Sequence, residues 1–470
     1  MGIFKAYDVR GVVPTDLDAN TAFKIGWGFG KLLSEDQKKP RVAVGMDARP
    51  HSPWIAAGFM DGLAAAGAAP EFIGPCSTPM LYWAVAGREQ KCHGGAMITA
   101  SHNPARYNGI KFCREDAVPV SAETGLQDIH QEMAGAPQPP AFFSNLPVVA
   151  LYDPAINPAE PRNQTPFGLN PSIFAGYSAH VTRFAKRLPE NFTVAVDTAN
   201  GMGGLYLSTL RALGLKLIAI NTDMDGTFPV HEANPSKLAN LKPLCALVKS
   251  EKARLGIAFD GDADRAVFVD EAGTPVGQDM VTALLAREFL AREKNAAILY
   301  DLRSSRAVPE IITADGGRAI RERVGHSYMK ATMRKVGCVF GGELAGHYYF
   351  RDNFYADSAI ITVIEVLNAL GRKNEPLSAL IKPLRRYQQT GEINFRVSDK
   401  EEVFQQAADK YGDGKIDYVD GVTVQFDDWW FNLRASNTEP VVRLNLEART
   451  RELLSQKFGE LRGLLGEPLE

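Results

Sequence analysis

The sequence lacks a strong excess of charge of either sign, and it lacks a long apolar segment. Its 470 residues carry 52 lysines and arginines against 55 aspartates and glutamates, which gives a formal net charge of −3. Such a chain has no global positive field to hold nucleic acid or an anionic membrane surface. The longest uncharged stretch near the N-terminus, residues 72–87, contains two prolines and is too short to span a bilayer. We therefore expect no nucleic-acid partner and no membrane partner.

Cysteine is scarce, and several common cofactor motifs are absent. The five cysteines are scattered and form no Cys-x-x-Cys pair, which argues against a disulfide framework or a thiolate zinc site and favours a cytoplasmic protein. The sequence contains no GxxxxGK(S/T), GxGxxG, HExxH or GxSxG motif. It therefore lacks the usual signatures of P-loop nucleotide hydrolysis, dinucleotide binding, zinc proteolysis and acyl transfer.

What the sequence does contain is the composition of a folded protein, arranged in repeated rounds. Hydrophobic residues make up 45% and charged residues 23%, which is ordinary for soluble globular proteins. Strands and helices alternate in three rounds, a pattern typical of parallel sheets with crossover helices. We expect strands at 41–46, 70–74, 94–99, 193–197, 216–221, 256–260 and 297–300, and helices at 53–66, 78–87, 279–292 and 358–370.

The C-terminal segment departs from this rhythm. It has a strand at 393–397, a helix, alternating strands up to 441–446 and a terminal helix, which is the pattern of an α+β domain. The stretch 134–171 is rich in proline and marks the first domain boundary, because proline interrupts helices and central strands. The expected fold class is α/β, with three similar α/β domains that have parallel or mixed sheets and a fourth α+β domain. The expected domains are 1–150, 151–275, 276–388 and 389–470.

One candidate site is the stretch Thr99–Pro104, which directly follows the strand at 94–99. Open α/β sheets bind ligands at the carboxyl ends of their strands, so Ser101 stands where a reactive group would be useful. We do not expect a triad with His102, because the side chains of adjacent residues in an extended loop diverge. Serine, asparagine and proline are also common in turns, so a structural turn is the alternative.

The sharpest local signal is Asp-Gly-Asp-Ala-Asp-Arg at 260–265, which follows another expected strand. Three carboxylates at alternate positions repel one another unless the loop curls around a cation. An all-oxygen donor set favours Mg²⁺ or Ca²⁺ over zinc. An EF-hand does not fit, because Arg265 stands where that loop requires glycine. We favour Mg²⁺ with a phosphate nearby over a solvated acidic turn.

Two further loops carry groups suited to a sugar phosphate. Gly341–His347 frames a glutamate and a histidine with glycines, and a glutamate can accept hydrogen bonds from paired hydroxyls. Arg434–Pro440, with Arg443, offers guanidinium, hydroxyl and amide groups, which suit phosphate. A structural turn is the alternative for each loop alone. The four loops together indicate phosphoryl transfer on a small polyol phosphate.

These motifs, together with Tyr7–Gly11, resemble the α-D-phosphohexomutase superfamily and most closely its bacterial phosphomannomutase/phosphoglucomutase branch. They occur in the family's order from residue 4 to residue 443. The resemblance implies four domains around a central cleft, and an isomerase that interconverts hexose 1-phosphate and hexose 6-phosphate of mannose, glucose or both. It implies a phosphoserine, Mg²⁺, a hexose 1,6-bisphosphate intermediate and small-molecule sugar phosphates as partners. We expect a monomer or a homodimer.

The resemblance also implies roles for individual residues. Ser101 would carry the phosphoryl group and would bind Mg²⁺ together with Asp260, Asp262 and Asp264. Arg10 and Lys111 would lie beside the phosphoserine, with Arg265 beside the metal. His326 would be a general acid or base. The residues that would contact the sugar or the phosphate that does not react are Arg303, Lys330, Glu343, His347, Arg434, Ser436, Asn437, Thr438 and Arg443.

Three positions depart from the family pattern. Ala345 replaces a usual serine, Leu344 an often-seen methionine, and Arg303 a usual lysine; the last change keeps the charge but alters its geometry. Leu344 matches neither the glutamine typical of phosphoglucosamine mutases nor the acidic residue of glucose-restricted mutases, which favours mannose and glucose phosphates. The alternatives are a phosphoglucosamine mutase, a phosphatase that releases the serine-bound phosphate to water, and a non-catalytic protein that binds sugar phosphate or Ca²⁺.

Overall fold

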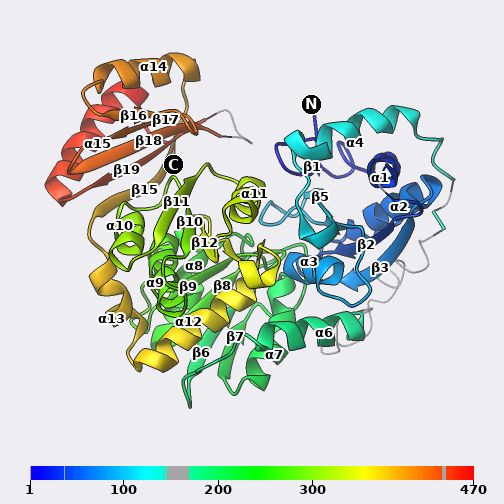
Figure 1. The fold of residues 1–470 in the computed structure, drawn as a ribbon, viewed down its shortest axis with the longest axis horizontal. Coiled ribbons are helices and arrows are strands. Elements are labelled where there is room, and N and C mark those ends of the chain that lie inside the picture. Colours follow the sequence, from blue (N-terminus) through cyan, green and yellow to red (C-terminus); the bar gives the residue numbers. More distant parts are fainter. Residues whose placement is uncertain (1, 36, 142, 145–168, 437–440, 470) are drawn as a thin grey trace. The chain divides into compact units, whose positions relative to one another are not determined.

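The computed structural model describes residues 2–35, 37–141, 143–144, 169–436 and 441–469 (Figure 1). The chain forms two compact units. Unit 1 comprises Met1–Val276 and Ala345–Ser378, and unit 2 comprises Gly277–Leu344 and Ala379–Glu470. Among the helices of the described residues, none is both long enough and apolar enough to cross a membrane. The four domain boundaries expected from the sequence remain predictions.

The first sheet of unit 1 is mixed. Its strand order is β1-β5-β4-β2-β3, with β2 parallel to β3 and β4, and β5 antiparallel to β4 and β1. β2 is an apolar run that is buried after its first residue, as a strand covered on both faces must be. The elements are β1 (Val9–Val12), α1 (Ala19–Ser34), β2 (Arg41–Met46), α2 (Ser52–Ala65), β3 (Ala69–Pro75), α3 (Thr78–Ala86), β4 (Gly94–Ile98), β5 (Tyr107–Arg114) and α4 (Gln127–Glu132).

Helices α1 and α2 pack closely because glycines line their contact. A Cβ atom on Gly62 would lie 1.9 Å from the carbonyl oxygen of Phe23, and one on Gly26 would lie 2.0 Å from that of Phe59. No other residue type fits at this separation. The tight helix pair shares a hydrophobic core with the strands of the sheet, including Val44 of β2.

The second sheet of unit 1 is smaller and has the order β7-β6-β8-β9. β6 is parallel to β7 and β8, and β9 is antiparallel to β8. Residues 260–265, which we call the acidic loop, start where β8 ends. Residues 99–107, which we call the serine loop, start where β4 ends. The elements are α6 (Pro171–Thr182), β6 (Thr193–Asp197), α7 (Tyr206–Ala212), β7 (Lys216–Ile220), α8 (Leu238–Ser250), β8 (Leu255–Phe259) and β9 (Ala266–Val269). The later segment of unit 1 adds helix α12 (Ala359–Lys373) and the strands β13 (Tyr348–Phe350) and β14 (Ala356–Asp357), which pair antiparallel with each other and lie outside this sheet.

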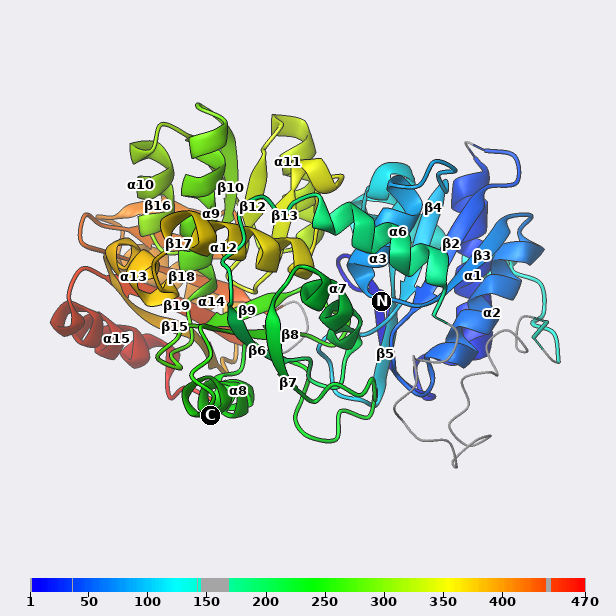
Figure 2. The same cartoon turned by 90° about the horizontal axis from the view of Figure 1, so that it is seen from below.

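Unit 2 contains three parallel strands and, later in the chain, an antiparallel sheet (Figures 1 and 2). β10 pairs in parallel with β11 and β12. The C-terminal sheet has the order β15-β19-β18-β17-β16 and is antiparallel throughout. The elements are α9 (Gln278–Arg292), β10 (Ala297–Asp301), α10 (Ala307–Ala314), β11 (Arg318–Glu322), α11 (His326–Val336), β12 (Phe340–Gly342), β15 (Gln388–Phe395), α14 (Lys400–Lys410), β16 (Lys415–Asp417), β17 (Val422–Gln425), β18 (Trp429–Ala435), β19 (Val442–Ala448) and α15 (Arg451–Leu465), with α13 (Leu377–Ile381) at the passage between units.

The expected strands lie within a few residues of the observed ones, with one informative difference. β15 begins at Gln388 rather than at 393. Its first residues are polar, and the register with β19 shifts between Gln389 and Glu392. Because the bulge interrupts the apolar alternation, the start of the strand was not visible in the sequence.

Candidate active site

Ser101 lies in a tight turn at the carboxyl end of β4. Its backbone is left-handed, with φ of 52°, and its amide donates a 2.8 Å hydrogen bond to Thr99 Oγ1. The side chain is buried, and its Oγ donates a 3.0 Å hydrogen bond to Asp260 Oδ2. The turn therefore brings the serine to the acidic loop, although 159 residues separate the two positions in the sequence.

The acidic loop after β8 is buried and folds back on its first residue. The backbone amides of Asp264 and Arg265 both donate 3.1 Å hydrogen bonds to Asp260 Oδ1. Lys111 Nζ, from β5, lies 2.6 Å from Oδ2 of Asp262 and of Asp264. Arg265 Nε donates a 2.8 Å hydrogen bond to Asp260 Oδ2. Two cationic side chains thus face three carboxylates.

This donor set fits a hard divalent cation. One oxygen from each of the three aspartates lies within 4.8 Å of the others. Within the described part of the chain, Oδ1 of Asp262 and Oδ1 of Asp264 are buried without a hydrogen-bond partner, and a buried acceptor left in that state is costly. When all three carboxylates are ionised, they and the side chains of Lys111 and Arg265 carry a net charge of −3 + 2 = −1. An anionic, oxygen-only site is the chemistry that Mg²⁺ requires.

Burial and neighbouring charges shift the pKa values in this cluster. Burial, and then Asp264, raise the pKa of Asp260. Burial alone would lower the pKa of Lys111, but Asp262 and Asp264 raise it above its ordinary value. The ammonium group therefore stays charged at neutral pH. The same electrostatics holds the loop and β5 together.

His102 and Arg10 flank the serine. His102 Nδ1 lies 3.4 Å from Ser101 Oγ, although we expected these side chains to diverge; the left-handed turn at Ser101 replaces the extended loop that we had assumed. Burial, and then Arg265, lower the pKa of His102 well below its ordinary value, so it is neutral at pH 7. Arg10 Nη1 donates a 2.8 Å hydrogen bond to Asn103 Oδ1 and so contacts the serine loop.

His347 reaches the acidic loop from the segment that precedes β13. Its Nδ1 lies 2.8 Å from Asp357 Oδ2 and 3.7 Å from Asp264 Oδ1. Asp357 is buried at the end of β14, and the ring of Tyr349 stacks on the imidazole at 6.2 Å between centroids. The imidazole is therefore held in orientation between two carboxylates.

Unit 2 holds a second charged cluster, centred on Arg303. Arg303 Nε donates a 3.0 Å hydrogen bond to Asp301 Oδ2. Its Nη2 lies 3.8 Å from Glu343 Oε2, and its Nη1 lies 3.5 Å from Glu392 Oε2. The backbone amide of Leu344 also donates to Asp301 Oδ2, at 3.0 Å. Asp301 thus connects the backbone of Leu344, in the loop that was expected to contact the sugar, to Arg303.

Glu392, on β15, connects Arg303 to the two arginines of the expected phosphate loop. Its Oε2 accepts a 2.7 Å hydrogen bond from Arg434 Nη2, and its Oε1 accepts a 3.1 Å hydrogen bond from Arg443 Nη1. Burial would raise the pKa of this carboxyl, but Arg303, Arg434 and Arg443 lower it to about 2. The carboxylate is therefore ionised at any pH at which the protein would be assayed.

The remaining predicted residues of unit 2 lie on α11 and at the end of β18. His326 begins α11, and Lys330, one turn later, is fully buried. The amide of Ser436, just after β18, donates a 3.0 Å hydrogen bond to the carbonyl of Val441, just before β19. Asn437 and Thr438 lie outside the described residues.

Four residues of the two clusters were not found from the sequence. Thr78 Oγ1 donates a 2.6 Å hydrogen bond to Asp262 Oδ2, and Asp301, Asp357 and Glu392 have the contacts described above. Asp301 and Asp357 each end a strand, so a search for acids at strand ends would have found both. Thr78 and Glu392 belong to no local motif that could have indicated them.

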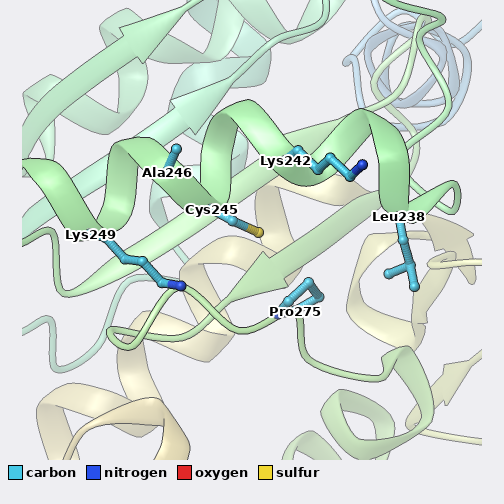
Figure 3. A pocket seen from close by; sticks show the side chains of 6 residues that line it. All are labelled: Leu238, Lys242, Cys245, Ala246, Lys249 and Pro275. Atoms are coloured by element: carbon cyan, nitrogen blue, oxygen red, sulfur yellow. The ribbon is translucent and has the colours of Figure 1, made fainter.

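A groove of about 590 Å³ lies beside α8 in unit 1 (Figure 3). None of the residues that line it is a site residue predicted from the sequence. The groove is therefore not the candidate active site. Its lining residues are Leu238, Lys242, Cys245, Ala246, Lys249 and Pro275.

Family models match the chain domain by domain. The models described as phosphoglucomutase/phosphomannomutase alpha/beta/alpha domains I, II and III match residues 1–139, 175–273 and 277–387, and the model of the C-terminal domain matches 392–462. These matches make the chain a mutase, an isomerase with three α/β domains and a distinct C-terminal domain. The chain belongs to the phosphoglucomutase/phosphomannomutase family. The expected family, fold class and enzyme class are thereby confirmed.

Named relatives match the chain over almost its whole length. The chain is 35% identical to a phosphomannomutase of Methanocaldococcus jannaschii, over 98% of this chain and 97% of the relative. It is 33% identical to a phosphomannomutase/phosphoglucomutase of Pseudomonas aeruginosa, over 97% of this chain and 93% of the relative. A solved structure of a phosphoglucomutase/phosphomannomutase family protein from Burkholderia thailandensis has 30% identity and a TM-score of 0.83, and the match covers 99% of this chain and 97% of that chain.

Proposed function

We propose that the chain is a Mg²⁺-dependent phosphohexomutase that interconverts hexose 1-phosphate and hexose 6-phosphate, with mannose, glucose or both as the sugar. The observation that carries the proposal is the 3.0 Å hydrogen bond between Ser101 Oγ and Asp260 Oδ2. It puts a hydroxyl nucleophile at the edge of a buried acidic loop that fits a divalent cation. The names of the relatives, phosphomannomutase and phosphomannomutase/phosphoglucomutase, support the substrate class.

In the proposed cycle the enzyme begins with a phosphoryl group on Ser101. A free hydroxyl of the bound hexose monophosphate attacks the phosphorus, the P–O bond to Ser101 breaks, and the hydroxyl proton passes to a base. The product is a hexose 1,6-bisphosphate. When the bisphosphate turns around and returns its other phosphoryl group to Ser101, the net reaction is an isomerisation without ATP. Such transfers depend on positioning and on charge stabilisation.

Residues of unit 1 are assigned to the transfer itself. Asp260, Asp262, Asp264 and Ser101 are the proposed Mg²⁺ ligands, and the bound ion would supply neutralisation of the charge on the phosphoryl oxygens. Lys111, whose ammonium already contacts two of the aspartates, is assigned to the same charge balance. Further cationic groups assigned to the phosphoserine and the metal are Arg10 and Arg265. His347, held by Asp357, is assigned to a sugar hydroxyl.

Residues of unit 2 are assigned to the sugar and to the phosphate that does not react. That phosphate is at C1 in one half of the cycle and at C6 in the other, so its site needs a cluster of donors rather than one fixed shape. Glu343, with Arg303 beside it, is assigned to sugar hydroxyls, as is Lys330, and His326 is assigned to general acid or base catalysis. The proposed phosphate donors are Arg434, Ser436, Asn437, Thr438 and Arg443.

The remaining parts of the proposal concern the activator, the compartment and the assembly. A hexose 1,6-bisphosphate is the proposed activator, because it can phosphorylate an unmodified Ser101 and leave a monophosphate behind. We propose a cytoplasmic enzyme that works as a monomer or a homodimer. Its partners are small-molecule sugar phosphates.

Replacing Ser101 by alanine tests the proposal directly. We expect Ser101→Ala to lose mannose 1-phosphate to mannose 6-phosphate conversion by about three orders of magnitude or more, because the nucleophile is removed. Ser250→Ala, at an exposed position at the end of α8, is the control and should keep full activity. Full conversion by Ser101→Ala would contradict the proposal.

The same assay separates the alternative activities. Steady release of inorganic phosphate faster than isomerisation would indicate a phosphatase instead. Turnover of glucosamine 1-phosphate well above that of mannose 1-phosphate and glucose 1-phosphate would indicate a phosphoglucosamine mutase. Absence of phosphate on Ser101, measured by intact-mass spectrometry after incubation with glucose 1,6-bisphosphate, would indicate a binding protein.

A further inference from the structure

Arg49, three residues after β2, is completely enclosed by the loop that carries Ser101. The residue is 1% exposed. Its Nη2 donates hydrogen bonds of 2.9 Å to the carbonyl of Ser101 and 2.7 Å to the carbonyl of Asn103. Its Nη1 donates hydrogen bonds of 2.9 Å to the carbonyl of Pro104 and 3.0 Å to the carbonyl of Tyr107. One guanidinium group thus gathers four backbone carbonyls of the serine loop.

The fifth N–H of Arg49 fixes the guanidinium from the other side. Nε donates a 3.0 Å hydrogen bond to Asp47 Oδ2, so all five guanidinium donors are used. Asp47 is itself held, because its Oδ1 accepts a 2.7 Å hydrogen bond from Ser52 Oγ at the start of α2. The planar fork is therefore fixed by β2 and α2, both of which belong to the rigid core of the first sheet.

The backbone of Ser101 needs such a support. A non-glycine residue with φ of 52° is in the left-handed region, which residues with a Cβ atom disfavour. The same turn directs the Ser101 carbonyl inward to Arg49 and leaves its Oγ at Asp260. Buried carbonyls that lost their donor would favour a different loop conformation, because a buried acceptor without a hydrogen bond is destabilising.

Two loops that follow strands of the second sheet pack against Arg49 and the Ser101 turn. A Cβ atom on Gly226 would lie 2.3 Å from the Cα of Arg49, and one on Gly261 would lie 2.4 Å from the carbonyl oxygen of Ser101. The ring of Phe228 lies 5.0 Å from the guanidinium carbon. Backbone therefore packs directly against Arg49 and the serine turn, so both are enclosed by protein on this side.

We propose that Arg49 is a positioning residue for phosphoryl transfer: it holds four carbonyls of the Ser101 loop so that Ser101 Oγ faces the acidic loop. Arg49 has no contact with the carboxylates of that loop among the hydrogen bonds and ion pairs of the described residues, so it acts through the backbone of the loop. This inference rests on the proposed role of Ser101. It adds a determinant that lies outside every motif of the sequence.

The deciding variant is Arg49→Lys in the full chain. A lysine keeps the positive charge, but it has three donors that radiate from one nitrogen, so it cannot reproduce a planar fork that holds four carbonyls. We expect kcat to fall about 30- to 100-fold, because a misplacement of about 1 Å can cost about 100-fold in rate. The KM should stay within about 3-fold, because the sugar and the second phosphate are assigned to other residues. Thermal unfolding establishes that the variant is folded at the assay temperature.

Two further measurements separate positioning from a loss of folded enzyme. Intact-mass spectrometry after incubation with glucose 1,6-bisphosphate gives the fraction of phosphorylated Ser101, and kcat is expressed per phosphorylated molecule. Arg88→Lys is the matched control. Arg88 follows α3 and donates hydrogen bonds to Glu71, on β3, and to the carbonyl of Ala84. This variant should keep the wild-type kcat and KM.

The outcomes distinguish this inference from the proposed function. An active Ser101→Ala variant would overturn the proposed function. An inactive Ser101→Ala together with Arg49→Lys at more than one third of the wild-type kcat would overturn the inference alone. If Arg49→Lys does not fold, the kcat of Asp47→Asn is measured instead. This variant weakens the contact that orients the guanidinium group but leaves Arg49 in place. A fall in kcat of about 10-fold at unchanged KM supports the inference, and an unchanged kcat overturns it.

Discussion

The two charged clusters of the molecule differ in how far they are closed to solvent. In unit 1, the side chains of Lys111, Asp262 and Asp264 are 5%, 0% and 2% exposed. In unit 2, the side chains of Arg303 and Arg434 are buried, but those of Glu392 and Arg443 are 24% and 22% exposed, so this cluster is open on one side. Both clusters hold opposite charges in contact, so the difference lies in access rather than in composition.

The difference in access indicates a division of labour. Breaking a buried ion pair by removing one partner costs about 3–5 kcal/mol, whereas solvent-exposed pairs are worth about 0–1 kcal/mol. The closed cluster around Ser101 is therefore suited to hold one fixed arrangement of charge during a chemical step. The open cluster around Glu392 is suited to exchange its carboxylate contacts for those of an incoming phosphate. Variants of the first should alter kcat, and variants of the second should alter KM.

The largest expected effect belongs to Asp262→Asn in the closed cluster. The change removes a proposed Mg²⁺ ligand charge and one of the two carboxylates that contact Lys111, so we expect kcat to fall about 1,000-fold, comparable to the removal of a major electrostatic contact. Steady-state kinetics at saturating Mg²⁺ measures it. Asp315→Asn, whose partner Arg287 is half exposed, should have no effect. A change in KM alone would contradict the division of labour.

Glu447, in unit 2, is also buried, and the described residues provide no ion pair to it. It therefore tests what burial does to a carboxylate without a compensating cation. Its Oε1 accepts hydrogen bonds from the amide of Arg306, at 2.9 Å, and from Trp430 Nε1, at 2.8 Å. Burial raises the pKa of Glu447 from its ordinary 4.5 to about 7. The stabilisation that this acid supplies when protonated is complete below pH 4.5 and is lost as the pH rises through 7.

We therefore expect Glu447→Gln to change the pH dependence of stability rather than the activity. The unfolding free energy of the wild type relative to Glu447→Gln should fall by on the order of 3 kcal/mol between pH 4.5 and pH 8. Urea unfolding of both proteins over that range measures the difference. A constant difference at all pH values would show that Glu447 titrates normally in the folded protein.

The next effect belongs to Arg434→Lys in the open cluster. Lysine keeps the charge but loses the planar fork that binds phosphate with two hydrogen bonds. We expect the KM for mannose 1-phosphate to rise about 10-fold, as the loss of one charged hydrogen bond predicts, with kcat within about 3-fold. Arg386→Lys, which pairs with Glu310 at a more exposed position, is the control. A fall in kcat without a change in KM would place Arg434 in the chemical step.

The sequence predicts most of the fold and of the closed cluster for one physical reason. Runs such as 94–99 and 256–260 identify strands, and the polar residues at and after their carboxyl ends, including Ser101 and Asp260, fall at the ligand-binding edge of a sheet. Both loops were therefore found by their position after a strand.

The contacts that support the site could not be predicted in this way. The carbonyls that Arg49 gathers lie between 52 and 58 residues away in the sequence, and a backbone acceptor leaves no trace in a sequence pattern. Glu392 follows a bulge in β15, where the alternation of the strand is interrupted. The grouping of Ala345–Ser378 with unit 1 likewise depends on long-range packing, which no local signal describes.

The smallest expected effect belongs to Glu392→Gln, and it tests the open cluster most sharply. In the free enzyme the carboxylate of Glu392 occupies one N–H each of Arg434 and Arg443, so an incoming phosphate competes with it. The Glu392–Arg443 pair is partly exposed, whereas Arg434 is buried. With a worth of up to about 1 kcal/mol for the partly exposed pair, its removal should lower the KM for mannose 1-phosphate about 3-fold and strengthen inhibition by inorganic phosphate to the same extent. Both effects should shrink at high salt, because Glu392 and Arg443 are partly accessible to solvent. A higher KM would instead mean that Glu392 holds the two guanidinium groups in the geometry that phosphate requires, and the open cluster would then be as fixed as the closed one.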